Sequence, residues 1–162
     1  MYRSFCLMTL FAFILTLVAY TVAPAQVDPG ALRKQHMEAI DDRGDLAGAL
    51  ALYTDDAVID GPGLCAAAPC VGKAAIQKEL ERRVAAKGRA TTISDCVSGN
   101  VLTSRFEVRS DQIREAGVER IVVWEIIEIR GDKISSVRGL SERTDPQTAR
   151  FLEWRRLQQP AR

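Results

Sequence analysis

The only histidine of the 162-residue chain, His36, is the first candidate for a base near neutral pH. It shares one predicted helical face with Leu32, Ala39 and Ile40, so its side chain is expected to point inward. An inward histidine can line a pocket or can be a hydrogen-bonded core residue, and both interpretations stay open. One histidine cannot form a multi-histidine metal centre, and we expect neither a metal nor a cofactor. The chain has no Gly-x-Ser-x-Gly nucleophile elbow.

Cysteine spacing offers a second kind of chemistry. Cys65 and Cys70 flank the short segment Ala-Ala-Ala-Pro, and in an exported protein this pair is expected to form a disulfide. A loop this short gains at most about 2–3 kcal/mol from the cross-link. A metal site is the alternative, but a second Cys or His pair at ligand spacing is missing. Cys96 lies in a predicted strand, where a buried, inert thiol is expected.

The N-terminal segment indicates the compartment. Arg3 precedes an apolar run from Phe5 to Tyr20, and Ala23-Pro24-Ala25 then supplies the small residues of a cleavage site. This pattern predicts a signal peptide over residues 1–25 and a secreted or periplasmic protein. An uncleaved membrane anchor is the alternative, because the run is close to the minimum length of a spanning helix. A lipid-modified Cys6 is disfavoured, since it follows a large residue.

Charge and length bound the function after cleavage. Only Arg3 would be lost from the 22 Lys+Arg, which leaves 21 against 21 Asp+Glu in a chain of 137 residues. The charges alternate in sign and form no basic block, which disfavours a nucleic-acid partner. The remaining length is enough for one domain with its own core.

Three helices are predicted in the first half of the mature chain. Asp28-Pro29 begins the first helix and Gly44 ends it. Asp45 caps the second helix, which is expected to end at Asp55-Asp56. The third helix follows the cysteine loop. Apolar residues at helical spacing mark the buried faces of the second and third helices: Leu46, Ala49, Leu50 and Tyr53, then Ile76, Leu80 and Val84.

Beyond the third helix the hydrophobic period changes to two, which predicts four strands joined by hairpins. The strands are expected over residues 91–97, 101–110, 118–130 and 134–142, and a final helix begins after Thr144-Asp145-Pro146. Helices first and a β-meander afterwards indicate an α+β domain, in which helices cover one face of an antiparallel sheet.

Three segments stand in a characteristic order along the chain: Arg43 to Val58, Val71 to Ile76 and Ile129 to Ile134. Together they resemble the SnoaL-like proteins of the nuclear transport factor 2 superfamily, over about residues 30–142. The resemblance implies a curved sheet that forms a cone around a pocket, closed by three N-terminal helices, and commonly a homodimer. It implies no single chemistry, because this fold hosts isomerases, epoxide hydrolases, cyclases, binding proteins and assembly modules.

The sequence patterns and the resemblance together predict three parts of the chain. We expect a signal peptide over residues 1–25, the SnoaL-like cone domain over residues 26–143 and a C-terminal helical tail over residues 144–162.

One pair of residues resembles a catalytic arrangement of this superfamily. Limonene epoxide hydrolases hold a water between two aspartates and an arginine, and Arg105-Phe106-Glu107 is similar to their strand pair. The resemblance implies that Arg105 anchors a substrate oxygen and that Glu107 orients Arg105 or acts as a base. Gly139 stands where the second aspartate is expected, and glycine cannot transfer a proton. A solvated strand face with ion pairs that include Arg109 is the alternative.

Ketosteroid isomerases of the superfamily imply another use of the pocket, with an acidic base and an oxyanion hole. Tyr53 and Asp60 could stand near such a pocket, with Glu107 or Glu128 as a second acid. Trp124 could line the cavity or fill a dimer interface.

Binding of a small, largely apolar molecule in the central pocket is the first functional hypothesis, because the acid–base set is incomplete. The alternatives are a cofactor-independent hydrolase or isomerase that uses Arg105 and Glu107, and a protein-interaction module that uses the sheet face. The expected partners are a small-molecule ligand and a second copy of the chain, with no nucleic acid and, after cleavage, no membrane. The candidate ligand-binding residues are Tyr53, Asp60, Trp124 and His36.

Overall fold

The structure is a computed structural model that describes residues 27–61, 64–65 and 69–158. The predicted signal peptide lies outside the described residues. Within the described part of the chain, no helix is long and apolar enough to cross a membrane.

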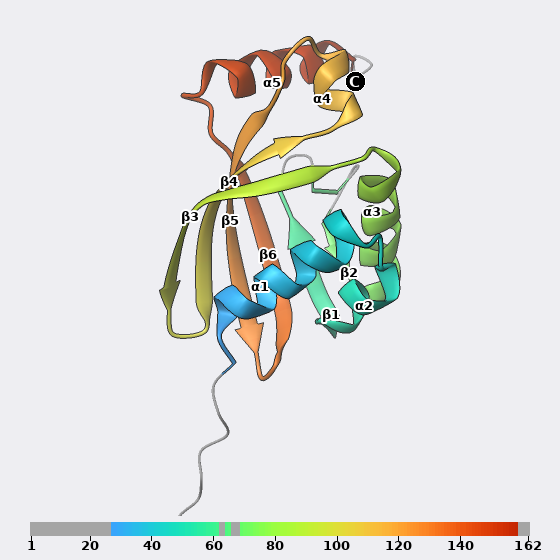
Figure 1. The fold of residues 1–162 in the computed structure, drawn as a ribbon, viewed down its shortest axis with the longest axis vertical. Helices are drawn as coiled ribbons and strands as arrows, with labels where there is room; N and C mark the ends of the chain where they lie inside the picture. The colour runs from blue at the N-terminus through green and yellow to red at the C-terminus, as the bar shows by residue number, and fades with distance from the viewer. Residues whose placement is uncertain (1–26, 62–63, 66–68, 159–162) are drawn as a thin grey trace, which may run out of the picture.

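A curved six-stranded sheet forms the centre of the protein (Figure 1), with the strand order β2-β1-β6-β5-β4-β3. Strands β3 to β6 form an antiparallel meander, β1 runs parallel to β6, and the short β2 pairs with β1 at the edge. The strands are β1 (Tyr53–Asp60), β2 (Cys70–Val71), β3 (Arg89–Ser98), β4 (Val101–Arg109), β5 (Ile121–Arg130) and β6 (Lys133–Ser141).

Helices lie on one face of the sheet and at one of its ends. Figure 1 shows α1 crossing the sheet, α2 and α3 beside it, and α4 with α5 at the far end of β4 and β5. The helices are α1 (Pro29–Met37), the π-helical turn η1 (Glu38–Asp42), α2 (Leu46–Ala51), α3 (Lys73–Ala85), α4 (Asp111–Glu115) and α5 (Pro146–Gln158). This is the α+β cone that the resemblance implied, with the C-terminal helix that the cap at residues 144–146 predicted.

Local capping explains where the first helices begin. The Asp28 carboxylate accepts a hydrogen bond from the Gly30 N–H at 2.9 Å, and the Asp45 carboxylate accepts one from the Gly48 N–H at 2.8 Å. Each bond satisfies a backbone donor that the helix itself leaves free. Both predicted helix starts are confirmed.

The second helix is shorter than its hydrophobic pattern predicts. It ends at Ala51, and Tyr53 is the first residue of β1 instead of the last turn of a helix. Pairing across the sheet decides this boundary: the Ile134 N–H donates to the Leu52 carbonyl at 2.8 Å, and Tyr53 pairs with Ile134. Long-range partners of this kind override a local helical pattern.

Three further features differ from the sequence prediction. The connection after β4 contains the short helix α4, because the Ser110 side chain accepts from the Ile113 N–H and caps it. The sheet is mixed rather than purely antiparallel, since β1 pairs with β6 in parallel. Cys96 is exposed rather than buried, because nearly every residue of edge strand β3 is exposed.

The predicted disulfide between Cys65 and Cys70 is present, with the two Cα atoms 6.0 Å apart. It closes the loop between β1 and β2, in which Leu64 packs against the main core.

Candidate functional site

Two adjoining cavities lie between the sheet and the helices. The deep chamber, of about 50 Å³, is lined by Arg33, His36, Tyr53 and apolar side chains of β1, β5 and β6. The wide chamber, of about 110 Å³, has mainly apolar walls that include Phe106, Val108, Ile121, Val123 and Phe151. Both chambers are lined by the same four residues where they meet: Leu64, Glu79, Arg83 and Glu125.

Glu125 is the buried acid at this junction, where the other acid, Glu79, is partly exposed. Alternation along β5 places it on the same face as Val123 and Ile127, and it is only 7 % exposed. Burial raises the pKa of Glu125, and the nearby positive charges of Arg33 and Arg83 oppose that shift. A buried carboxyl group with a raised pKa at a cavity is suited to donate or accept a proton.

Arg33 reaches the deep chamber beside Glu125 from α1 and is 4 % exposed. Its Nη1 donates to the Thr92 hydroxyl at 2.9 Å, and its guanidinium lies over the Phe106 ring, 4.8 Å from the centroid. Its Nε is 3.9 Å from Glu125 Oε2, which is an ion pair but is too long for a hydrogen bond. Neither Nε nor Nη2 has a hydrogen-bond partner among the described residues.

His36 and Tyr53 form a second polar pair in the deep chamber. The Tyr53 hydroxyl is hydrogen bonded to His36 Nε2 at 3.0 Å. Burial, with the charges of Arg83 and Arg33, lowers the pKa of His36 to about 3. Burial, with the negative charge of Glu125, raises the pKa of Tyr53. Both side chains are therefore neutral at pH 7, and His36 cannot act there as an imidazolium acid.

Asp41 holds the neighbouring arginine in place. The Arg83 Nη2 donates to both carboxylate oxygens of Asp41, at 2.8 and 3.0 Å, and the Ala90 N–H donates to Asp41 Oδ2 at 3.0 Å. The π-helical turn η1 carries Asp41, which is only 6 % exposed. This cluster connects η1, α3 and the start of β3. Among the residues that the structure describes, Arg33 is the arginine of the deep chamber whose fully buried donors lack a hydrogen-bond partner.

Leu64 fills the place of a side chain that β6 lacks. Gly139 pairs with Glu125 across the sheet, and a Cβ atom at Gly139 would lie 2.5 Å from Leu64 Cδ1. The disulfide loop thus supplies an apolar wall at the position where the resemblance to epoxide hydrolases implied a second acid.

Arg105 and Glu107 lie on the other face of the sheet, and neither lines the two chambers. Arg105 is bonded to Glu142 through Nε and Nη2, at 2.8 and 2.9 Å. Glu107 is paired with Arg109 at 2.9 Å and with Arg120 at 3.0 Å. This is the arrangement of the alternative interpretation, a strand face with ion pairs. The catalytic role of Arg105 and Glu107 stays a prediction.

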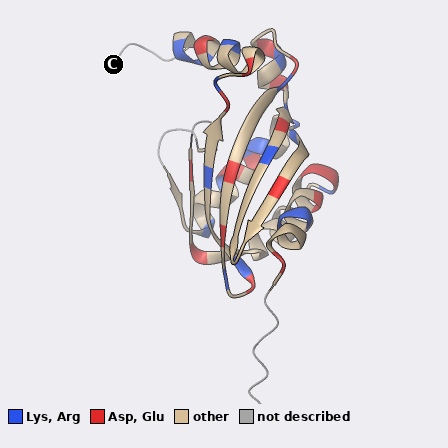
Figure 2. Ribbon diagram, turned by 90° about the vertical axis from the view of Figure 1, so that its left-hand side faces the viewer, with Lys and Arg blue, Asp and Glu red and all other residues tan. Residues whose placement is uncertain are grey.

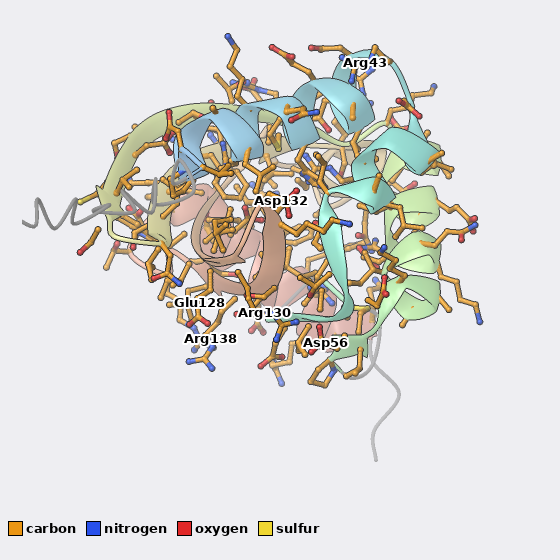
Figure 3. All side chains as sticks on the ribbon, turned by 90° about the horizontal axis from the view of Figure 1, so that it is seen from below. Arg43, Asp56, Glu128, Arg130, Asp132 and Arg138 are labelled. Atoms are coloured by element: carbon orange, nitrogen blue, oxygen red, sulfur yellow. A yellow bond between two sulfur atoms is a disulfide. The ribbon has the colours of Figure 1, made fainter. Side chains whose placement is uncertain are left out.

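Figure 2 shows charged residues of both signs interspersed over the strands and helices. Two further candidates, Trp124 and Asp60, line neither chamber. Trp124 is 36 % exposed, and its Nε1 donates to Glu142 at 3.0 Å beside Arg105. Asp60 is exposed at the end of β1, where it pairs with Arg138 across the sheet. Glu128, the possible second acid, is exposed and points away from α1 on the far side of the sheet (Figure 3). Of the predicted ligand-binding residues, the structure brings together His36 and Tyr53.

Sequence reasoning missed Arg33 and Glu125, although both left a signal. Glu125 is an acid in register with Val123, Ile127 and Ile129, on the apolar side of a strand. Arg33 lies one turn before His36, on the helix whose apolar face was expected to point inward. A charged residue on an otherwise apolar face is the pattern to look for, because burial of a charge is costly without a partner.

The described residues contain no group of three or more His, Cys, Asp or Glu side chains arranged to hold a metal ion. The polar side chains of the deep chamber include Arg33, Glu125, His36 and Tyr53, together with Glu79 and Arg83. Arg82, Arg155, Ser110, Gln112 and Ser141 add polar groups to the wide chamber.

The family follows from the fold and from a direct sequence match. Residues 34–137 match the family model described as a SnoaL-like domain. The chain belongs to the SnoaL-like domain family, because this match covers more than half of its length. A search of curated protein sequences found no match.

Solved structures with this fold differ widely in sequence. A nuclear transport factor 2-like protein of unknown function from Cytophaga hutchinsonii is 11 % identical, with a TM-score of 0.59, and the match covers 75 % of this chain and 96 % of that one. A Kribbella flavida protein named provisionally as a ketosteroid isomerase is 16 % identical, with a TM-score of 0.57 and coverages of 70 % and 76 %. The epoxide hydrolase/cyclase-like enzyme SalBIII, associated with pyran ring formation in salinomycin, is 16 % identical, with a TM-score of 0.60 and coverages of 72 % and 92 %. At these identities the likeness shows the fold alone.

Proposed function

We propose that this protein is exported and binds a small, largely apolar molecule in the two adjoining chambers. The observation that carries the proposal is a partly open, mostly apolar cavity on which several polar groups converge, among them Arg33, Glu125 and the His36–Tyr53 pair. Ligand sites of proteins typically have this composition. The wide chamber offers roughly ten water-sized positions, which suits a ligand body of roughly ten non-hydrogen atoms.

Blocking the wide chamber tests the proposal. Val108 lines this chamber and is only partly buried, so Val108→Trp should fill the space at a small cost in stability. We expect neutral bicyclic aromatics such as 2-naphthol to bind to the unaltered protein, as followed by fluorescence, and to bind at least tenfold more weakly to Val108→Trp.

The matched control is Val97→Trp, which adds the same side chain at an exposed position of β3. Binding that is equal in the two tryptophan variants, or the absence of binding by any neutral probe, would contradict the proposal.

A second candidate function is cofactor-independent proton transfer, as in an isomerase or hydrolase. It is favoured by the raised pKa of Glu125 beside a buried arginine at the cavity. In this scheme Glu125 removes a proton from the carbon next to a carbonyl group and Arg33 stabilises the developing oxyanion. The names of the related structures, one an isomerase and one a hydrolase/cyclase-like enzyme, are compatible with such chemistry.

Hydrogen exchange of 2-tetralone in D₂O, followed by NMR, tests this second candidate. We expect the protein to accelerate exchange at the carbons next to the carbonyl, Glu125→Gln to abolish the acceleration, and Glu107→Gln to leave it intact. The opposite pattern would restore Glu107 as the base, and no acceleration by the unaltered protein would leave binding as the function.

Export has its own test. Expression with the native N-terminal segment in a bacterium, followed by mass measurement of the extracytoplasmic protein, should give a chain that begins at Gln26. A chain that retains residues 1–25 in the membrane would identify the segment as an anchor.

A further inference from the structure

The guanidinium of Arg33 has one donor that is hydrogen bonded and two donors that are not. Its Nη1 is satisfied by Thr92, whereas Nε and Nη2 have no partner among the described residues. Arg33 is 4 % exposed, so water cannot freely solvate these two donors. A buried guanidinium with unsatisfied donors lowers the free energy of unfolding, because each lost hydrogen bond of a charged group carries a desolvation penalty. A ligand that supplies the missing acceptors would remove this penalty.

In other arginines of this protein, the same two donors, Nε and Nη2, bind a carboxylate. Arg105 uses Nε and Nη2 to hold the Glu142 carboxylate, at 2.8 and 2.9 Å. Arg156 uses the same two atoms to hold the Glu153 carboxylate, at 3.0 and 2.7 Å. These two donors point in parallel and match the two oxygens of a carboxylate. The neighbouring Glu125 does not fill this role for Arg33, since its nearest oxygen is 3.9 Å from Nε.

The surroundings restrict the anion to a small, singly charged one. The deep chamber of about 50 Å³ has room for roughly four water-sized groups. Glu125 stands at the junction with the wide chamber, and a doubly charged group such as phosphate would meet stronger repulsion there. The wide chamber continues from this junction with mainly apolar walls, among them Phe106, Val123 and Phe151, and its lining also includes the charged residues Arg82 and Arg155.

We propose that the ligand is an amphipathic monocarboxylate, whose carboxylate binds bidentately to Nε and Nη2 of Arg33 and whose apolar body fills the wide chamber. This inference rests on the proposed binding function and specifies its ligand class. Phe106 contributes to both parts, because it stacks under the Arg33 guanidinium and lines the wide chamber.

Calorimetric titration with octanoate and with 1-octanol tests the proposal. The two probes share an apolar chain and differ in the carboxylate. We expect octanoate to bind the unaltered protein at pH 7.5 at least about tenfold more tightly than 1-octanol, because two charge-assisted hydrogen bonds favour the acid. Arg33→Lys keeps the charge but loses the two parallel donors, so it should remove most of this preference, measured within the variant as the ratio of the 1-octanol to the octanoate dissociation constant.

Arg156→Lys is the matched control. Arg156 holds a carboxylate through the same two atoms, but on the exposed surface of α5 away from both chambers. We expect this variant to keep the full preference for octanoate. Equal binding of octanoate and 1-octanol by the unaltered protein, or a preference that Arg33→Lys retains, would overturn the proposal.

Loss of 1-octanol binding in Arg33→Lys would indicate a folding defect, so a second measurement uses the unaltered protein alone. NMR of carboxyl-¹³C-labelled octanoate reports the pKa of the bound ligand. We expect that pKa to fall below the value of free octanoate, because Arg33 favours the ionised form; a raised pKa would show that the acid binds in its neutral form and would overturn the proposal.

The two proposals fail in different ways. If 1-octanol binds and Val108→Trp prevents it, the chambers are a ligand site even when the preference for a carboxylate is absent. If neither probe binds, or Val108→Trp has no effect, the binding function fails and the carboxylate inference fails with it.

Discussion

Buried polar residues set the character of the site at the residue scale. Arg33, Glu125, His36 and Tyr53 come from three different elements, and each is at most 8 % exposed. Burial acts on them in opposite directions: it raises the pKa of Glu125 and of Tyr53 and lowers that of His36. At neutral pH the histidine and the tyrosine are uncharged, so among these four residues Arg33 carries the positive charge that can attract a ligand anion.

The lowered pKa of His36 predicts acid sensitivity. The folded-state pKa of about 3 lies below the ordinary value of 6.5, so the unfolded chain takes up a proton that the folded one refuses. Stability is therefore fully present above about pH 6.5 and is lost as the pH falls from there toward 3, at up to about 1.4 kcal/mol per pH unit. Urea unfolding at pH 7 and at pH 5.5 measures the loss.

His36→Gln should flatten this dependence. Glu125, whose pKa is raised, has the opposite effect, because its contribution to the free energy of unfolding is lost as the pH rises. The difference between the unaltered protein and His36→Gln cancels that contribution. Parallel pH profiles for the two proteins would show that His36 does not stay neutral in the folded state.

Asp41 is expected to be the most sensitive structural carboxylate of the site. It accepts three hydrogen bonds, two of them from Arg83, and is 6 % exposed. Asp41→Ala should lower the free energy of unfolding by about 3 kcal/mol or more, because it leaves a partly buried guanidinium without its counter-charge. Asp42→Ala, at the exposed neighbouring position, should cost less than about 1 kcal/mol in the same urea titration. Similar losses in both variants would contradict this role.

The disulfide loop decides the shape of the chambers at the element scale. It carries Leu64, which lines both chambers and occupies the space above Gly139. Any larger residue at position 139 would therefore push Leu64 into the ligand site. An element that is short and irregular in the sequence thus becomes a wall of the cavity.

Loss of the cross-link should have a modest effect on stability. Cys65 and Cys70 are five positions apart, and closing so short a loop contributes about 2 kcal/mol. We expect Cys70→Ser to lower the free energy of unfolding by that amount under non-reducing conditions. Cys96→Ser, at an exposed thiol, is the control and should leave it nearly unchanged. A larger effect at Cys96 than at Cys70 would refute the prediction.

Apolar residues on the outer sheet face bear on the assembly of the whole molecule. Trp124 and Leu140 pair across β5 and β6, and they are 36 % and 49 % exposed. Adjacent exposed apolar side chains on a sheet commonly mark an interface. The predicted homodimer can bury this pair against its symmetry mate.

A charge at this position tests the dimer. Leu140→Glu should raise the dimer dissociation constant by about tenfold or more, as measured by sedimentation equilibrium, because it places a charge in an apolar contact. Leu157→Glu on α5 changes an even more exposed leucine away from this pair and should have no effect. A monomeric unaltered protein, or equal effects of the two substitutions, would exclude this interface.

Local signals in the sequence were sufficient for most of the elements and for the family. Caps at Asp28 and Asp45, the change of period after the third helix, and the cysteine pair act over a few residues, so they can be read in order along the chain. The boundary at Tyr53 could not be read in this way, because the parallel pairing of β1 with β6 joins segments about 80 positions apart.

The site itself was decided by the tertiary structure. Alternation correctly put Arg105 and Glu107 on one strand face, but periodicity does not say which face the helices cover. Only the packing of α1 against the sheet brings Arg33 to Glu125 and places both in the lining of a cavity. The sequence by itself determined which residues alternate and where elements begin; the three-dimensional contacts determined which of those residues are deprived of water, and so which can bind a ligand.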